Sequence, residues 1–305
     1  MKIFVTGGSG MVGRNIIALS SSQEHEIIAP SSKEVNLMNF DSLSSFIKSE
    51  RPDAIIHCAG LVGGIQANIK SPFDFAHINA LLGLNVIKAA LDNNVEKVIN
   101  LGSSCMYPRD AVNPLNESDI LKGELEPTNE GYAIAKVLTA RLCDYAHVQY
   151  GANYKTVIPC NLYGYWDKFD PNHSHMIPAV IRKIHDAKVA GADSVDIWGD
   201  GKARREFMFA EDLADFCLFA LSKFDALEQL TNVGLGFDYS ISDYYSAIAE
   251  LVGFDGEFTY DLSKPAGMKQ KLVSVERLEQ LGWSAKHSLT QGLEKTYQFY
   301  LKEHC

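Results

Sequence analysis

The stretch KIFVTGGSGMVGR, residues 2–14, decides the fold. An apolar run is followed at once by glycines with the spacing G-x-x-G-x-x-G, and then by residues with the periodicity of a helix. Glycines let the backbone turn tightly and approach a pyrophosphate, and the helix N-terminus that follows offers amide donors to it. We therefore predict a dinucleotide-binding turn rather than a plain tight turn. Its predicted cofactor-binding residues are Gly7, Gly10, Met11, Val12 and Gly13.

Apolar strands and amphipathic helices alternate regularly from this turn to about residue 165. Strands are expected near residues 26–30, 54–60, 97–104 and 154–164, with helices between them. This alternation is typical of α/β proteins and predicts a Rossmann-like, doubly wound parallel sheet with helices on both faces. Beyond it the alternation weakens, which predicts a smaller C-terminal α/β lobe. We expect a dinucleotide-binding domain at 1–165, with a return segment near 205–225, and a substrate lobe at 166–305.

Composition narrows the class of partner. The 305 residues carry 28 basic and 38 acidic side chains, a net charge of −10, so no general attraction to nucleic acid or anionic membrane is expected. No stretch reaches the roughly 18 uncharged apolar residues of a membrane span. The N-terminus lacks the pattern of a secretion signal, and the six cysteines are widely spaced, without zinc-type spacing. We therefore expect a cytoplasmic protein without a bound metal.

The end of the second expected strand bears on the choice of cofactor. A fold specific for NAD usually places an acidic residue there for the ribose 2′-hydroxyl. Residues 29–33 contain no acid, and Ser31, Ser32 and Lys33 occupy the place instead. Hydroxyls and a cation suit a 2′-phosphate, so we predict NADP(H). The alternative is a solvated turn in which Arg14 and Lys33 are merely exposed.

A second motif, Tyr132-x-x-x-Lys136, lies on a predicted helix that follows a strand ending in Ser103. Residues four apart on a helix share one face, and an ammonium favours a nearby phenolate. Lys136, helped by the positive charge of the oxidised cofactor, is therefore expected to lower the pKa of Tyr132. Tyr132 can then exchange a proton with a carbonyl or carbinol oxygen that Ser103 holds. The alternative is a pair of surface residues. The glycine turn, strand-end serine and this pair nevertheless occur in the order that a nicotinamide-dependent oxidoreductase needs.

The chain resembles the extended short-chain dehydrogenases/reductases and, within them, the GDP-L-fucose synthases. The resemblance spans nearly the whole chain and rests on the segments GMVG, VGGIQAN, LGSSCMYP, LEPTNEGYAIAK, NLYG, NHSHMIPA, WGDGKARREF and KPAGMKQKLVSVERLEQLGW. It implies a bifunctional, NADPH-dependent enzyme that epimerises C3 and C5 and reduces C4 of GDP-4-keto-6-deoxy-D-mannose, which yields GDP-L-fucose.

For the epimerisations the resemblance implies Cys105 as the base and His175 as the acid. A ketone at C4 acidifies the protons on C3 and C5, and a base on one face with an acid on the other inverts each centre. For the reduction it implies that Tyr132 gives the proton, that Lys136 adjusts Tyr132 and holds the ribose, and that Ser103 orients the oxygen. Without the resemblance, Cys105 is interpreted as a buried thiol at a strand end and His175 as a loop histidine.

The resemblance also places contacts to the GDP group. Lys and Arg suit a diphosphate through charge-assisted hydrogen bonds, although each is also consistent with an ordinary surface charge. Lys183 stands where an arginine is expected, and Trp198 is equally consistent with packing between the lobes. Three further departures are Ser9 for a basic residue, Gly131 for a proline, and Tyr165–Trp166 near the sugar pocket, which could change the keto-sugar that fits. The implied substrate-binding residues are Asn161, Lys183, Trp198, Arg205 and Lys271.

Other functions stay open. The same scaffold could act on a related GDP-4-keto-sugar, such as a colitose precursor or a keto-heptose, with simple C4 reduction in place of double epimerisation. A non-catalytic dinucleotide sensor is a distant alternative, disfavoured because Ser103, Tyr132 and Lys136 are all present. The long helices expected at about 75–94 and 130–150 are apolar enough to form a dimer face, so a homodimer is expected; the alternative is packing within one chain.

Overall fold

A computed structural model of the chain describes residues 1–20, 25–170, 174–263 and 268–305. Parts of two segments quoted above, residues 172–173 of NHSHMIPA and 264–267 of KPAGMKQK, lie outside the described residues.

Six parallel strands form the central sheet, in the order β10-β5-β4-β3-β1-β2. The order reverses between β1 and β3, because the chain adds β2 on one side of β1 and then continues on the other. Ligands of open parallel sheets bind outside the carboxyl ends of the strands at such a switch point. The predicted dinucleotide turn follows β1 at this place. The strands are β1 (Lys2–Thr6), β2 (Glu26–Ile28), β3 (Ala54–His57), β4 (Lys97–Leu101), β5 (Asn153–Pro159) and β10 (Leu230–Val233).

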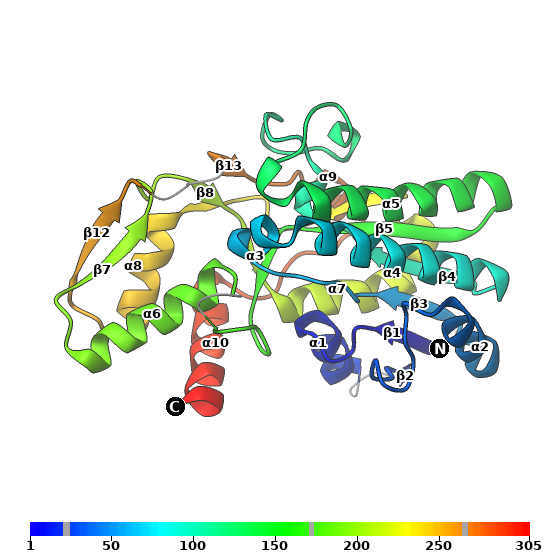
Figure 1. Cartoon of the computed structure of the whole chain (residues 1–305), viewed down its shortest axis with the longest axis horizontal. Helices are drawn as coiled ribbons and strands as arrows, with labels where there is room; N and C mark the ends of the chain where they lie inside the picture. The colour runs from blue at the N-terminus through cyan, green and yellow to red at the C-terminus, as the bar shows by residue number, and fades with distance from the viewer. Residues whose placement is uncertain (21–24, 171–173, 264–267) are drawn as a thin grey trace.

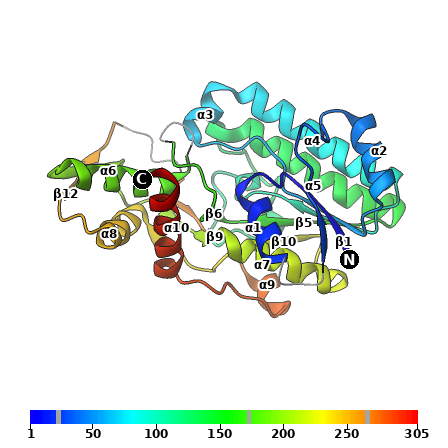
Figure 2. The ribbon, with the colours of Figure 1, turned by 90° about the horizontal axis from the view of Figure 1, so that it is seen from below.

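Helices cover both faces of this sheet (Figures 1 and 2). On one face lie α2 (Phe40–Glu50), α4 (Pro72–Asp92) and α5 (Glu130–Tyr150), and on the other lie α1 (Met11–Ser20) and α7 (Ala210–Ser222), which pack together. Two clusters of buried apolar side chains fill the layers between helices and strands. The predicted doubly wound α/β fold is thus confirmed.

The second half of the chain contributes to both parts of the molecule. Helix α7 returns to the central sheet, and β10 joins its edge beside β5. This strand lies beyond the return segment expected near 205–225, because a short run such as LTNV carries too little pattern to reveal its partner.

The smaller lobe has its own apolar core. Helices α6 (Met176–Ala190), α8 (Ile241–Val252) and α10 (Leu289–His304) pack there beside a two-stranded parallel sheet of β12 (Glu257–Asp261) and β7 (Ser194–Trp198). A three-stranded sheet lies between this lobe and the central sheet, in the order β11 (Tyr239–Ser240), β8 (Arg204–Arg205) and β13 (Gln270–Lys271). The parallel pair β6 (Asn161–Tyr163) and β9 (Phe207–Phe209) also lies there (Figure 2). The remaining helices are α3 (Ile65–Lys70) and α9 (Glu276–Gln280). Single 3₁₀ turns lie at Ser104–Met106, Glu117–Asp119, Pro127–Asn129 and Phe224–Ala226.

Polar side chains start several helices. Asn39 caps α2 by accepting a hydrogen bond of 3.0 Å from the backbone N–H of Ser42. Ser240 and Ser288 begin α8 and α10 with capping boxes. Asn129 holds the same position before α5, but its side chain makes no capping hydrogen bond.

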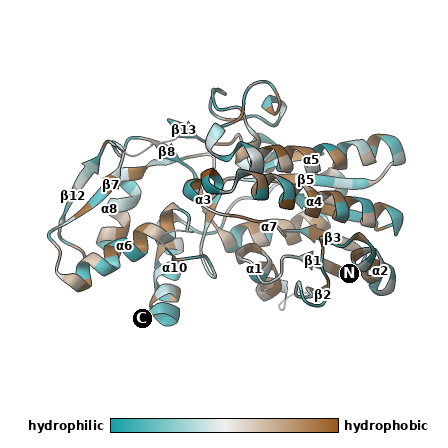
Figure 3. Cartoon of the chain, in the orientation of Figure 1, coloured by the Kyte–Doolittle hydropathy of each residue, from teal (hydrophilic) through white to brown (hydrophobic). Residues whose placement is uncertain are grey.

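Hydropathy follows these layers (Figure 3). Hydrophobic residues run along α1, α4 and α5, whereas the C-terminal end of α10 is hydrophilic. None of the helices in the described parts of the chain is long and apolar enough to cross a membrane.

Candidate active site

The glycine turn after β1 is tightly packed on its inner side. Gly7 has φ +70°, and a Cβ there would lie 2.8 Å from the backbone of Ala59. A Cβ on Gly13 would lie 2.7 Å from Cα of Gly8, so the start of α1 can approach the turn only as glycine. Gly10 is exposed, and its N–H donates to the Gly7 carbonyl over 2.9 Å. The turn is therefore closed against the protein and open outward, as a pyrophosphate site requires.

The end of β2 presents one group that the sequence argument left out. Glu34 accepts hydrogen bonds from the backbone N–H and the hydroxyl of Ser31, at 2.7 and 2.8 Å, and these bonds lower its pKa. Glu34 lies just beyond residues 29–33, and the turn brings its carboxylate back to Ser31. Ser32 and Lys33 are exposed at this turn, so a hydroxyl and a cation that suit a 2′-phosphate remain accessible.

The loop after β3 is held by a buried amide. Asn79 of α4 accepts from the N–H of Leu61 at 2.9 Å and donates to its carbonyl at 3.1 Å. A Cβ on Gly64 would lie 3.0 Å from the carbonyl oxygen of Ser174, so residues 61–64 reach the segment just before α6. Asn79 thus fixes the loop that touches the neighbour of His175.

Lys136 and Tyr132 project from the first turns of α5 toward the end of β4. The Lys136 ammonium donates to the Leu101 carbonyl at 2.8 Å and lies 5.8 Å from the centroid of the Tyr132 ring. Burial lowers the pKa of Lys136 to about 8, against a smaller opposing effect of Cys58. The structure therefore brings Lys136 and Tyr132 together, with the ammonium near the ring and tied to the backbone.

The pKa of Tyr132 is raised, which contradicts the expectation that Lys136 lowers it. Burial is the main cause and Cys105 adds to it, while a hydrogen bond with the Ser103 side chain acts in the opposite direction. Spacing on a helix reveals the neighbouring ammonium, whereas the burial of the phenol depends on tertiary packing. At neutral pH Tyr132 is protonated and is equipped to donate a proton.

Cys105 lies in the single 3₁₀ turn that follows β4 and is half-buried. Its backbone N–H donates to the Ser103 hydroxyl at 3.3 Å, which caps the turn. One amide donor and one cationic donor face its sulfur: Nδ2 of Asn129 lies at 3.1 Å and Nζ of Lys271 at 3.8 Å. Both contacts fix the position of the sulfur. Cys105 is therefore set in an environment suited to acid–base chemistry.

Arg205 and Lys271 are cross-strand neighbours in the parallel pair β8–β13. Burial lowers the pKa of Arg205, while the carboxylates of Glu126 and Asp238 act against this shift. Lys271 reaches the sulfur of Cys105. The three-stranded sheet thus places two cations next to the end of β4, where an anionic ligand could be bound.

His175 is the residue that precedes α6, and it is half-buried. Its pKa is lowered, chiefly because burial disfavours the imidazolium and also because Lys168 is positively charged. Its ring is therefore mostly neutral near pH 7.

The remaining predicted substrate residues lie in the smaller lobe or at its base. Asn161 donates from Nδ2 to the carbonyl of Glu206 at 2.9 Å. Lys183 forms an ion pair of 2.8 Å with Asp196, and Trp198 follows Asp196 on the same face of β7. Lys183 and Trp198 thus gather around β7, whereas Ser103, Cys105, Tyr132 and Lys136 gather at the end of β4.

Sequence reasoning missed Asn129 and Glu206. Asn129 enters the sequence analysis only as part of the segment LEPTNEGYAIAK. An asparagine before a helix often caps it with a side-chain hydrogen bond, so its residue type alone could have marked it. Glu206 is fully buried and accepts from the backbone N–H groups of Leu235, Gly236 and Val273, at 2.5, 2.9 and 3.0 Å. Nothing in the letters RREF distinguishes it from a surface carboxylate.

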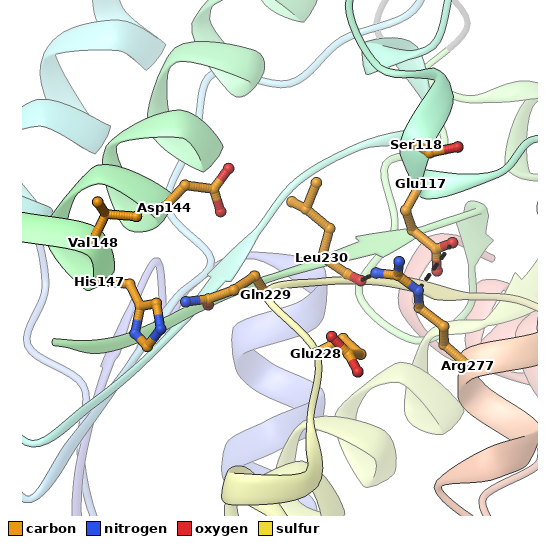
Figure 4. A pocket seen from close by; sticks show the side chains of 9 residues that line it. All are labelled: Glu117, Ser118, Asp144, His147, Val148, Glu228, Gln229, Leu230 and Arg277. Carbon is orange, nitrogen blue, oxygen red and sulfur yellow. Dashed lines mark hydrogen bonds and ion pairs between the residues drawn. The ribbon is translucent and has the colours of Figure 1, made fainter. Parts of the chain in front are cut away.

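A cavity of about 360 Å³ opens elsewhere on the molecule (Figure 4). Arg277 there contacts Glu117 at 3.7 Å and donates to the Leu230 carbonyl at 2.6 Å, and Glu117 accepts from the N–H of Asn232. These groups hold the edge strand β10 and include none of the predicted site residues. The lining residues are Glu117, Ser118, Asp144, His147, Val148, Glu228, Gln229, Leu230 and Arg277.

Comparison with known proteins gives a consistent set of relatives. The model of the NAD dependent epimerase/dehydratase family matches residues 3–236. The chain is 53% identical over 304 residues to the GDP-L-colitose synthase of Yersinia pseudotuberculosis, with 99% of each chain covered. It is 48% identical over 300 residues to the GDP-L-fucose synthase of Azorhizobium caulinodans, with 98% of this chain and 96% of that one covered. Among solved structures, a GDP-mannoheptose C4 reductase from Campylobacter jejuni with NADP bound matches with a TM-score of 0.89 and 30% identity, over 98% of each chain.

Proposed function

The chain belongs to the NAD dependent epimerase/dehydratase family, and on that premise we propose that it epimerises C3 and C5 and reduces C4 of GDP-4-keto-6-deoxy-D-mannose to GDP-L-fucose. It is an NADP-dependent oxidoreductase. The observation that carries the proposal is the meeting of Cys105 and Tyr132 at one place. Ser103 hydrogen-bonds both the backbone of Cys105 and the phenol of Tyr132.

The cofactor would be held by the glycine turn 7–13, by Ser32 and Lys33 at the end of β2, and by Lys136. The tight inner packing of Gly7 and Gly13 fits a pyrophosphate that approaches the backbone, as described above. When bound, NADPH supplies the hydride for the reduction.

In the epimerisations Cys105 removes a proton beside the C4 ketone, and His175 returns one to the opposite face of the ring. Asn129 and Lys271 hold the sulfur in place by contacts of 3.1 and 3.8 Å. His175 must be protonated before it can act as an acid, and its lowered pKa limits that form at neutral pH. For each centre one C–H bond breaks and one forms, so the sugar gains and loses no atoms.

In the reduction Tyr132 donates its phenolic proton to the C4 oxygen, which becomes a hydroxyl. The raised pKa of Tyr132 keeps this proton in place until the oxygen acquires charge. Ser103 forms a second hydrogen bond to the C4 oxygen, beside that of Tyr132. Arg205 and Lys271 provide positive charge for the diphosphate of the substrate, with Asn161, Lys183 and Trp198 on the nucleotide side.

A second candidate substrate is the colitose precursor. The 53% identity to a GDP-L-colitose synthase is the observation that supports this second candidate. Colitose is a 3,6-dideoxyhexose, so C3 carries no hydroxyl and only C5 can be inverted. The residues at the end of β4 serve both reactions, and Tyr165–Trp166 remains the proposed place where the two sugars are distinguished.

The proposal is tested by giving the purified chain NADPH with GDP-4-keto-6-deoxy-D-mannose or with its 3-deoxy counterpart. NADPH oxidation gives kcat/KM for each sugar, and NMR of the product gives its configuration. The proposal predicts GDP-L-fucose and a higher kcat/KM for the 3-hydroxy sugar. A higher value for the deoxy sugar would move the assignment to colitose. If neither sugar supported NADPH oxidation, both candidate functions would be overturned.

We also propose a homodimer formed through α4 and α5. Ile134, Leu138 and Tyr145 are exposed along one stripe of α5, and Leu84 is exposed on α4. The occupant we expect is a second copy of the chain, packed as a four-helix bundle.

We further propose a cytoplasmic location, which fits the six free cysteines. We propose that the boundary between the two lobes lies near residue 165.

A further inference from the structure

Asn129 occupies the N-cap position of α5 without acting as a cap. Its backbone has φ −141° and ψ 22°, and its side chain forms no hydrogen bond to the first turn of the helix. Asparagine is among the best N-cap residues, so this helix forgoes a stabilising contact that α2, α8 and α10 all have. The amide instead donates from Nδ2 to the sulfur of Cys105, over 3.1 Å.

The other end of the same amide is not satisfied. Oδ1 of Asn129 is buried, and no described residue donates a hydrogen bond to it. A buried acceptor without a donor costs free energy, so native structures rarely keep one unless a ligand or water supplies the donor. Because the opposite end of the amide touches Cys105, a donor on Oδ1 would lie beside the reactive sulfur.

We propose that Asn129 is a positioning residue for Cys105, and that its Oδ1 accepts a hydrogen bond from a ring hydroxyl of the bound hexose. Its N–H group holds the sulfur by the 3.1 Å contact and so aims it at the proton that it removes. Two titratable groups face the sulfur from other elements: the Lys271 ammonium from β13 and the Tyr132 phenol from α5. The hexose part of this inference rests on the proposed function; the contact with Cys105 does not.

The first experiment measures the thiol without substrate. Iodoacetamide alkylation of Cys105 is followed by peptide mass spectrometry between pH 5 and 10, in a Cys305→Ser background because Cys305 is the exposed cysteine. Asn129→Ala removes the donor that holds the sulfur, so alkylation at pH 7 should fall about tenfold. Asn129→Asp places an oxygen against the sulfur and should slow alkylation further. Unchanged curves in both variants would overturn the proposal.

Measurements of stability and kinetics distinguish a positioning role of Asn129 from a purely structural one. Asn129→Ala loses no capping bond and should keep the Tm, whereas Ser288→Ala, which removes the cap of α10, should lower it. In the epimerisation assay both Asn129 variants should exchange substrate protons at least about tenfold more slowly. Asn129→Asp keeps Oδ1 and should keep KM, whereas Asn129→Ala should raise KM. Equal KM values for the two variants would overturn the hexose contact.

The two assays separate this inference from the proposed function. If alkylation responds to Asn129 while the parent chain exchanges no protons of the keto-sugar, the proposed function fails and the positioning of Cys105 stands. If exchange of the substrate protons requires Cys105, but the Asn129 variants change neither this exchange nor the alkylation of Cys105, the proposed function stands and the inference fails.

Discussion

The ammonium of Lys271 lies 3.8 Å from the sulfur of Cys105. Cys105 follows β4 of the central sheet, whereas Lys271 belongs to β13, 166 residues further along the chain. The resemblance to GDP-L-fucose synthases implied only a contact between Lys271 and the GDP group. The geometry gives this lysine a second contact, because its ammonium also reaches the sulfur of Cys105.

Lys271→Met tests which task dominates. If the contact between the ammonium and the sulfur matters for reactivity, iodoacetamide alkylation of Cys105 at pH 7 should fall roughly threefold to tenfold. KM for the nucleotide sugar should rise as well, because charge near the diphosphate is lost. Lys271→Arg keeps the charge and should restore KM and part of the alkylation rate. A raised KM with unaltered alkylation would assign Lys271 to the diphosphate alone.

Tyr132→Phe should separate the reduction from the epimerisations. The variant has no phenolic proton to donate, so kcat for NADPH oxidation should fall about 10²- to 10⁴-fold. Exchange of the C3 and C5 protons should continue, because Cys105 and His175 are untouched. Loss of exchange together with reduction would show that the two chemistries share Tyr132. Circular dichroism of both proteins checks that the fold is kept.

Glu206 should make stability depend on pH. Burial raises its pKa to about 7 from an ordinary 4.5, although three backbone N–H groups act in the opposite direction. The folded chain therefore binds this proton more tightly than the unfolded chain. The contribution is fully present below pH 4.5 and is lost as the pH rises through about 7. The loss is of the order of 3 kcal/mol.

The measurement is urea unfolding between pH 4.5 and 8 for the parent chain, Glu206→Gln and the exposed control Glu228→Gln. Glu206→Gln should be less stable at every pH, because its amide NH₂ faces backbone donors, and its stability should depend less on pH. The control should follow the parent. Parallel curves for all three proteins would refute the assignment of the titration to Glu206.

The proposed dimer predicts that a charge on α5 separates the subunits. Leu138→Glu lies in the middle of the exposed stripe and should convert the protein to monomer in analytical ultracentrifugation. Val189→Glu places the same charge on an exposed apolar residue of α6 and should leave the mass unchanged. A parent chain that sediments as a monomer at micromolar concentration would contradict the proposal.

Much of the fold and part of the site could be read from local patterns. The strand, glycine turn and helix at residues 2–14 and the Tyr132–Lys136 pair depend on spacing alone, so the sequence predicts them directly. The position of β10 depends on which strand edge is left for it, and a four-residue run does not specify that. The same limit applies to Glu206, whose three donors come from residues far along the chain.

Electrostatic environment was the other limit. The expected fall in the pKa of Tyr132 considered one charge, whereas burial of the phenol reverses the direction. Glu34 reaches Ser31 because the turn after β2 folds back, which is a property of the backbone and not of residues 29–33. Asn129 shows the opposite case, since a residue type that suits a helix cap contacts a thiol instead.

The central claim is that Cys105 performs the proton removal that starts the epimerisations. Its most direct test is to incubate the enzyme with GDP-4-keto-6-deoxy-D-mannose in D₂O without NADPH and to follow C3 and C5 by proton NMR. We predict that deuterium enters both positions with the parent chain and neither position with Cys105→Ser. Equal deuterium uptake by the variant, or none by a parent chain that still reduces the sugar, would contradict the account.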